Sequence, residues 1–442
     1  MSTLFGRQLW LWVVLLCSGP LAAVELTLAE ALQRTVQHSP KLQTYPYQLR
    51  QDAALQQLAL LKPDPELELS AENLLGTNEL SGVKGAEISL VFSQLLERGD
   101  KAQLRSAQAN QQHQLTQASF AADKLDVLAQ STGRFIEVLS LQQQLSWLAQ
   151  RFELEQKALL TAQQRAAQAL VQQADVKRLE RRLLQTGLDQ ARLQGELELA
   201  RRQLALLWNA EPDFDRLSGN LSLLPLLPEE ARLQQRLLQS PQLALFLTKQ
   251  RLADSLLQLQ SANAVAGLRW SAGVRYNNEV NSPSLQLGLS MPLLNSQRSS
   301  AQLEAASAAA QQAAVAAELE QRQLQLSLLG LLRQLHSIRA EIRATEQQLL
   351  PSARVVLSAT QQGYQSGVYD MTDLLAAQQE LLDSELSLLQ LQRRFHLQLT
   401  ELQRLTGFGL AQTGPVAFSA SAEVSVVAPL ASVRARELSD EK

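Results

Sequence analysis

The chain has 442 residues, with 40 basic and 43 acidic side chains and a formal net charge of −3. A charge this close to neutral gives no reason to expect nucleic acid as a partner. One cysteine excludes a disulfide framework, and four scattered histidines argue against a metal site with several ligands. Aromatic residues make up only 5% of the chain, and windows rich in Leu, Gln, Ala, Glu and Arg favour long helices.

The first 23 residues are typical of a secretory signal. Arg7 precedes an apolar run from Leu9 to Cys17, and small residues follow up to Ala23. The run is too short to span a bilayer as a helix, so we expect cleavage after Ala23 and export of the remainder. Cys17 is an alternative lipid-anchor cysteine, although the residue before it is a bulky leucine. No later stretch is long and apolar enough for a transmembrane helix.

The exported part consists of two similar sequence repeats. Ser39-Pro40 recurs as Ser240-Pro241, and the pattern from Gln163 to Asp175 recurs from Gln361 to Asp373, displaced by about two hundred residues. Between the copies, prolines and a glycine interrupt the helical pattern. The sequence therefore predicts a signal peptide (1–23), a first repeat (24–207), a linker (208–227), a second repeat (228–410) and a poorly ordered tail (411–442).

Each repeat predicts the same succession of elements. Helical periodicity opens the repeats over 27–62 and 228–262, and alternating runs predict hairpins over about 66–93 and 268–291. A single helix of unusual length is expected to follow, over about 98–168 and 295–365, which is on the order of 100 Å. The chain then turns and returns as shorter helices over 174–207 and 372–406.

The predicted strands have one apolar and one polar face. Phe92, Trp270 and Tyr276 lie among aliphatic residues on one face, and charged and hydroxyl side chains occupy the other. Strands of about nine to eleven residues suit a tilted crossing of an outer membrane, with the apolar face toward lipid. Four strands cannot close a barrel, so we expect three copies to supply twelve. A small soluble sheet that caps a coiled coil remains the alternative.

The order of helix, hairpin, long helix, turn and return helix, twice over, resembles the TolC family of outer-membrane efflux channels. Segment 26–40 resembles the opening of family members, and segment 363–378 resembles their second turn. The resemblance covers about residues 26–410. Segment 97–101 resembles the Gly-Gly-Lys-Arg stretch of the cobalt–zinc–cadmium (CzcC-like) branch, from which Asp100 departs.

The resemblance implies a mainly α-helical chain with a small β part. Three copies would form a twelve-stranded transmembrane β-barrel on a periplasmic α-helical barrel. Such a trimer is a passive exit duct that docks with a periplasmic adaptor and an inner-membrane RND pump driven by the proton gradient. Heavy-metal cations are the expected cargo. A drug-efflux or type I secretion duct is the alternative within the fold, and a periplasmic coiled-coil scaffold without a pore is the alternative outside it.

By the same resemblance, acidic side chains surround the periplasmic mouth of the duct. Asp373 would face the lumen, where threefold repetition makes a ring that favours cations, and Asp175 is its equivalent in the first repeat. Tyr364 would bond across to Asp175, and loss of that bond would open the mouth. The plain structural alternative is that Asp370 caps the return helix, with Asp373 in its first turn.

No nucleophile–base pair, phosphate loop or metal cage stands out, so we expect neither an enzyme nor a cofactor.

The two helical turns are the expected adaptor contacts. By the same resemblance, some relatives carry arginines that add to the bonds between the two turns; Val171 and Tyr369 stand at these positions here. Gly367 permits a left-handed backbone, whereas Ala169 does so less readily, and we therefore expect the two turns to differ in shape. The turn residues are Ala169, Leu170, Val171, Gly367, Val368 and Tyr369.

Overall fold

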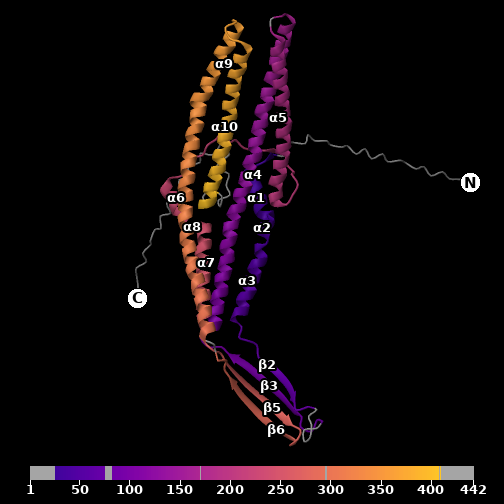
Figure 1. The fold of residues 1–442 in the computed structure, drawn as a ribbon, viewed down its shortest axis with the longest axis vertical. Helices are drawn as coiled ribbons and strands as arrows, with labels where there is room; N and C mark the ends of the chain where they lie inside the picture. Colours follow the sequence, from indigo (N-terminus) through magenta and orange to yellow (C-terminus); the bar gives the residue numbers. More distant parts are fainter. Residues whose placement is uncertain (1–24, 75–81, 170, 294–295, 408, 410–442) are drawn as a thin grey trace, which may run out of the picture.

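Long helices run along one axis of the molecule, and a small sheet lies at one end of them (Figure 1). The computed structural model describes residues 25–74, 82–169, 171–293, 296–407 and 409. The predicted signal peptide, Cys17, Leu170 and the predicted tail lie outside these residues. The mainly α-helical class with a small β part is confirmed.

The first half of the chain opens with short elements and ends with two long helices. Its elements are β1 (Glu25–Leu26), α1 (Leu28–His38), α2 (Pro40–Gln43), α3 (Tyr45–Leu60), β2 (Glu66–Glu72), β3 (Glu87–Leu96), α4 (Lys101–Ala167), α5 (Gln173–Ala205) and the 3₁₀ turn η2 (Leu206–Trp208). With 67 residues, α4 is a rod of about 100 Å that joins the sheet to the far tip of the molecule (Figure 1).

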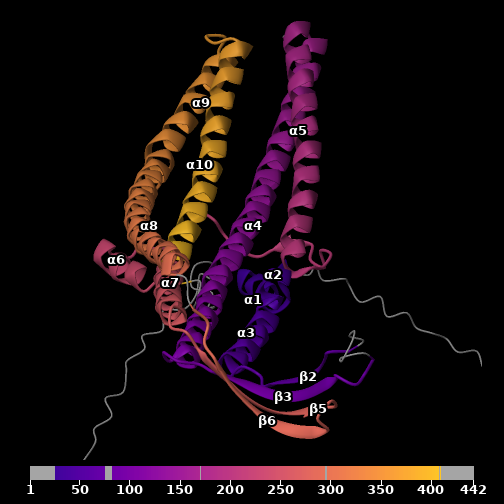
Figure 2. The same ribbon diagram turned by 60° about the horizontal axis from the view of Figure 1, so that its bottom comes forward.

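The second half repeats this order. Its elements are β4 (Arg216–Leu217), α6 (Glu230–Leu238), α7 (Pro241–Asn263), β5 (Leu268–Asn277), β6 (Ser282–Ser290), α8 (Ser296–Ala344), the π-helical turn η3 (Thr345–Leu349), α9 (Leu350–Gln365) and α10 (Met371–Thr406). At the far tip, α4 with α5 and α9 with α10 form two separate helical hairpins (Figures 1 and 2).

The second rod is helical over 296–365, close to the predicted 295–365, and contains one wider turn that the sequence analysis did not predict. Pro351 has no backbone N–H to donate and its ring crowds the preceding turn. The helix widens there into η3, in which the Leu350 N–H bonds to the Thr345 carbonyl, five residues back. The extra residue moves the buried side of the rod, because Leu350 is 7% exposed and Leu349 is 56% exposed.

The passage from the sheet to α4 relies on unusual backbone and on paired charges. Gly99 and Asp100 have φ values of 78° and 54°, in the left-handed region that aspartate tolerates better than most residues. The Arg105 guanidinium donates to the Glu97 carboxylate across this turn at 2.8 Å. It thereby lowers the pKa of Glu97. Asp100 thus occupies a position where the backbone itself favours glycine.

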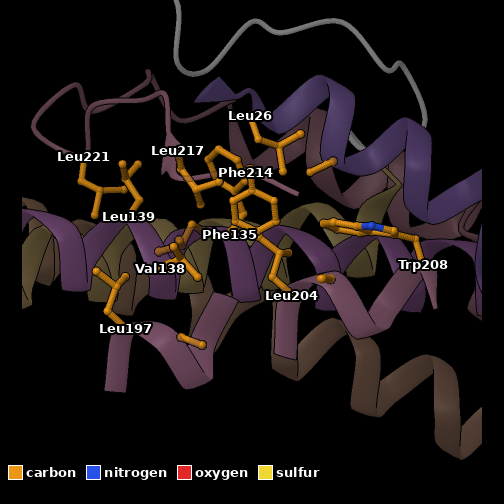
Figure 3. Packing of buried hydrophobic residues seen from close by; sticks show 14 residues of the cluster. Leu26, Phe135, Val138, Leu139, Leu197, Leu204, Trp208, Phe214, Leu217 and Leu221 are labelled. Atoms are coloured by element: carbon orange, nitrogen blue, oxygen red, sulfur yellow. The ribbon is translucent and has the colours of Figure 1, made fainter. Parts of the chain in front are cut away.

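Two apolar clusters make the core where the hairpins meet the opening helices. In the first cluster, Phe135 and Val138 of α4 pack against Leu204 and Trp208 (Figure 3). Leu26 joins this cluster because β1 pairs in parallel with β4, which follows η2 in the chain. In the second cluster, leucines and isoleucines of α8 pack against α6, α7 and Phe395 of α10. The core therefore lies at mid-length and leaves both ends of the molecule for other contacts.

Candidate functional site

The tip of the first helical hairpin is a tight left-handed turn. Ala169 has φ +58°, and its N–H bonds to the Ala166 carbonyl at 3.0 Å. Although alanine takes this backbone less readily than glycine, Ala169 and Gly367 (φ +78°) both adopt it. The tight reversal from α4 into α5 imposes the conformation, at a cost of roughly 1–2 kcal/mol for a residue with a Cβ.

The tip of the second hairpin is closed by an aromatic ring. The Gly363 carbonyl accepts from the N–H groups of Val368 and Tyr369, at 2.8 and 3.3 Å. The Tyr369 ring lies so close to Gly363 that a Cβ added there would overlap the ring. Only glycine fits beneath the ring, and Val368 is left exposed at the end of the molecule.

Asp370 and Asp373 form a capping box at the start of α10. The Asp373 N–H donates to Asp370 Oδ1 at 2.9 Å, and the Asp370 N–H donates to Asp373 Oδ2 at 3.1 Å. The first of these bonds lowers the pKa of Asp370, because the N–H stabilises the charged carboxylate. The structural alternative for this pair is thus confirmed. Asp373 is also exposed, so its carboxylate remains available to solvent.

Asp175 and Tyr364 do not bond to each other within one chain. Asp175 lies in the first turn of α5 and accepts from Arg178 Nη1 at 2.7 Å. Within the described part of the chain, no hydrogen bond joins it to Tyr364. The Tyr364 ring instead packs on an apolar cluster of Ala162, Val176, Leu179 and Met371, which Val171 also contacts. The Asp175–Arg178 pair has the i, i+3 spacing of a surface ion pair, and that spacing could have revealed it in the sequence.

A charged cluster that the sequence did not reveal lies one turn beyond Leu179. Glu155 of α4 is only 8% exposed and accepts from Arg151, Arg182 and Thr186. Arg182 of α5 also reaches Gln379 of α10. Arg151 and Glu155 are one helical turn apart on α4, but Arg182 and Gln379 come from two other helices, and residue spacing does not predict that the three helices meet here.

The four strands form one sheet in the order β2-β3-β5-β6, with every pair antiparallel (Figures 1 and 2). The two predicted hairpins are therefore joined through β3 and β5. β2 has seven residues, fewer than the predicted nine to eleven. Pro65 directly precedes β2 and has no N–H to extend the ladder on that side.

The register places most of the apolar strand residues on one face; Val91 and Leu95 lie on the other. Leu67 lies opposite Phe92, and Tyr276 lies opposite Ile88. The Phe92 and Trp270 rings contact each other with centroids 5.6 Å apart, yet the two side chains are 39% and 38% exposed. Within the described residues nothing covers this face. Its exposed members are Leu67, Leu69, Ile88, Leu90, Phe92, Trp270, Val274, Tyr276, Leu285, Leu287 and Leu289.

Ion pairs and hydrogen bonds cross the opposite face of the sheet. Arg275 Nη1 donates to Glu87 at 2.9 Å, and Arg269 Nη1 donates to Glu66 at 2.6 Å. Asn277 Nδ2 also donates to Glu87, at 2.8 Å. Because the partners come from different strands, these bonds link β2, β3 and β5 and keep the polar face satisfied.

No described helix has the length and hydropathy needed to cross a membrane. Across the same residues, no three His, Cys, Asp or Glu side chains gather as metal ligands would.

Long helical rods with a two-faced sheet at one end are also the fold of solved outer-membrane channel proteins. VceC of Vibrio cholerae superposes with a TM-score of 0.72 and 18% identity, over 86% of this chain and 96% of VceC. CusC superposes with a TM-score of 0.75 and 17% identity, over 87% of this chain and 92% of CusC. These likenesses show the fold.

Sequence comparison finds similarity to proteins of the same kind. Residues 232–408 match the family described as Outer membrane efflux protein. The cobalt-zinc-cadmium resistance protein CzcC of Cupriavidus metallidurans is 25% identical over 346 residues, which are 78% of this chain and 81% of CzcC. Residues 232–408 thus carry the pattern of this family, and most of the chain is similar to one outer-membrane efflux relative.

Proposed function

We propose that three copies of this chain assemble into a passive outer-membrane exit duct for heavy-metal cations. The uncovered apolar face of the sheet carries the proposal. An apolar surface this large is unfavourable in water and has to be covered by lipid or protein. Because the opposite face of the same sheet is polar, the sheet suits the wall of a barrel that separates lipid from water. The rods would continue the barrel into the periplasm as a helical cylinder.

The strand order supports closure by identical copies. β2 and β6 are the free edges, and the alternating directions in the sheet make them antiparallel to each other. The β6 edge of one copy can therefore pair with the β2 edge of the next in the alternating pattern of an outer-membrane barrel. Three copies give twelve strands with no edge left open, which removes the liability of exposed edge strands.

The partners and the cargo follow from the relatives. The exposed turns at the far tip are the surface available to a periplasmic adaptor, and the adaptor would connect the duct to an RND pump in the inner membrane. Heavy-metal cations are proposed because the relative that covers most of the chain is named a cobalt-zinc-cadmium resistance protein. A water-filled duct selects by charge more than by ligand geometry, so hydrated cations could pass through it.

Native mass in mild detergent, followed by conductance in planar bilayers, tests this function. A trimer that forms discrete channels is the expected result. A monomer recovered without detergent would favour the pore-free scaffold and overturn the duct. Deletion strains exposed to cobalt, zinc, cadmium and hydrophobic drugs distinguish the cargo. Loss of drug tolerance alone would favour a drug-efflux duct.

Asp373 supplies a specific test of the mouth. Asp373→Asn removes three charges from the trimer and should lower cation over anion preference severalfold, because a charged ring sets the local potential. Reversal potentials in a salt gradient measure the effect. Asp383→Asn, on the same helix and farther from the tip, is the matched control. Unchanged selectivity in Asp373→Asn would remove Asp373 from the constriction.

A further inference from the structure

Glu155 is a buried carboxylate, and both of its oxygens accept hydrogen bonds. Its Oε1 accepts from Arg151 Nε at 2.8 Å and from Arg182 Nε at 2.9 Å. Its Oε2 accepts from Thr186 Oγ1 at 2.6 Å. Burial of a carboxylate is costly unless it is paired and hydrogen-bonded, so this cluster ties α4 firmly to α5.

Arg182 extends the cluster to the second hairpin. Its Nη2 donates to Gln379 Oε1 at 3.3 Å, and its Nη1 donates to the Leu375 carbonyl at 3.5 Å, both on α10. A guanidinium has five N–H donors in a rigid plane, so Arg182 of α5 can donate to α4 and to α10 at the same time. One helical turn nearer the tip, Leu179 of the same face packs in the cluster that contains Met371 of α10.

Further contacts tie α10 to the first hairpin farther from the tip. Trp147 Nε1 donates to Glu385 Oε2 at 2.9 Å, and Arg393 pairs with Glu137 at 3.2 Å. Both of these contacts reach α4, whereas Arg182 belongs to α5. The part of α10 that precedes Glu385 is consequently held to the first hairpin by Arg182 and by the apolar cluster around Met371.

We propose that Arg182 is a positioning residue that holds the tip of α10, and with it Asp373, against the first hairpin. This inference rests on the proposed duct. Movement of the α10 tip away from α5 breaks the bonds from Arg182 to Gln379 and Leu375, while the Arg182–Glu155 pair stays intact. Arg182 thereby sets how far the mouth can open. Asp175 and Tyr364, which the family resemblance suggested for this role, are engaged elsewhere within the chain.

Single-channel conductance of the full-length protein in planar bilayers tests the proposal. Arg182→Met keeps the apolar stem of the side chain and leaves Glu155 with Arg151 and Thr186, so the first hairpin retains its own contacts. The variant should shift the equilibrium toward the wider mouth by about tenfold, as expected for loss of hydrogen bonds to a charged group. Arg181→Met, at the neighbouring exposed arginine, is the matched control and should conduct like the wild type.

A second variant keeps the test decisive if Arg182→Met fails to assemble. Gln379→Ala removes the Arg182–Gln379 bond, together with a bond to Asp383 within α10, and keeps the bond from Arg182 to the Leu375 carbonyl. It should raise conductance in the same direction by a smaller factor. Combined with Arg182→Met, it should add little, because both changes break the same contact. Wild-type conductance in all three variants would overturn the positioning role while leaving the duct intact. A wild-type protein that forms no channel would instead overturn the duct, and this inference with it.

Discussion

His396 is a buried imidazole at the junction of α10 with the linker. Its side chain is 2% exposed, its ring meets Phe395 edge-on, and its Nε2–H donates to the Leu221 carbonyl at 3.0 Å. Burial lowers the pKa of His396 because the charged form loses its hydration. The folded protein therefore favours the neutral ring, and protonation favours the unfolded chain.

This shift predicts a pH dependence of stability. The folded-state pKa lies below the ordinary value of 6.5, so the unfolded chain takes up the proton first as pH falls. The free energy of unfolding contributed by His396 is fully present above that value and decreases below it. Thermal unfolding measured from pH 8 to pH 5 should thus show a smaller loss in His396→Gln than in the wild type. His336→Gln, at an exposed histidine, should keep the full wild-type slope; an equally steep slope in His396→Gln would contradict the assignment.

Backbone conformation at single residues was only partly predictable. Gly367 takes the left-handed backbone that its residue type suggested, and Asp370 caps α10 with Asp373 as the spacing of the two acids allows. Ala169 adopts the same backbone against its local preference, because the hairpin reverses over very few residues. Local preference is worth about 1 kcal/mol per residue, and the packing of two long helices readily overrides it.

At the scale of elements, the π-helical turn η3 decides which side chains of the second rod are buried. In an uninterrupted helix, the residue four positions after buried Thr345 would be buried as well, and that residue is Leu349. Instead the wider turn carries Leu350 into the core. The sequence signal is Pro351, which disfavours the regular helix at this point.

The two neighbouring leucines consequently respond differently to truncation. Leu350→Ala should lower the free energy of unfolding by about 2–5 kcal/mol, since it leaves a cavity. Leu349→Ala should change it by no more than about 0.5 kcal/mol, since that side chain is largely exposed. Denaturant unfolding of both variants measures the difference. The opposite ranking would mean that the rod continues as a regular helix through η3.

At the scale of the whole molecule, the two faces of the sheet meet different surroundings in the proposed duct. Leu69 lies on the apolar face, which would meet lipid, and Ser70 lies on the polar face between Glu68 and Glu72. A lysine on the lipid side of a barrel costs about 2–4 kcal/mol at mid-membrane, whereas a lysine among glutamates in water does not.

Leu69→Lys should therefore reduce the amount of trimer in the outer membrane several-fold, and Ser70→Lys should leave it near the wild-type level. Heat-resistant oligomer in membrane fractions provides the measurement. Equal assembly of the two variants would mean that the apolar face is not embedded in lipid, and another cover for it would have to be found.

The sequence by itself determined the elements and their order. Alternation along the strands and 3.6-residue periodicity along the helices are local patterns, and the repetition of the whole succession made each pattern more secure. The two faces of the sheet and the family resemblance follow from the same local information. They were enough to predict a mainly helical outer-membrane channel subunit before any packing was known.

Only the tertiary structure decided which helices are tied together at the tip. Arg182 meets Glu155 across a hairpin and Gln379 from the other half of the chain, and the pairing of β3 with β5 joins segments equally distant in sequence. Such contacts depend on the angle and rotation at which long helices pack, and small local deviations such as η3 change that rotation. Which side chains of two long helices meet therefore depends on the whole fold, and it cannot be predicted from residue spacing along the chain.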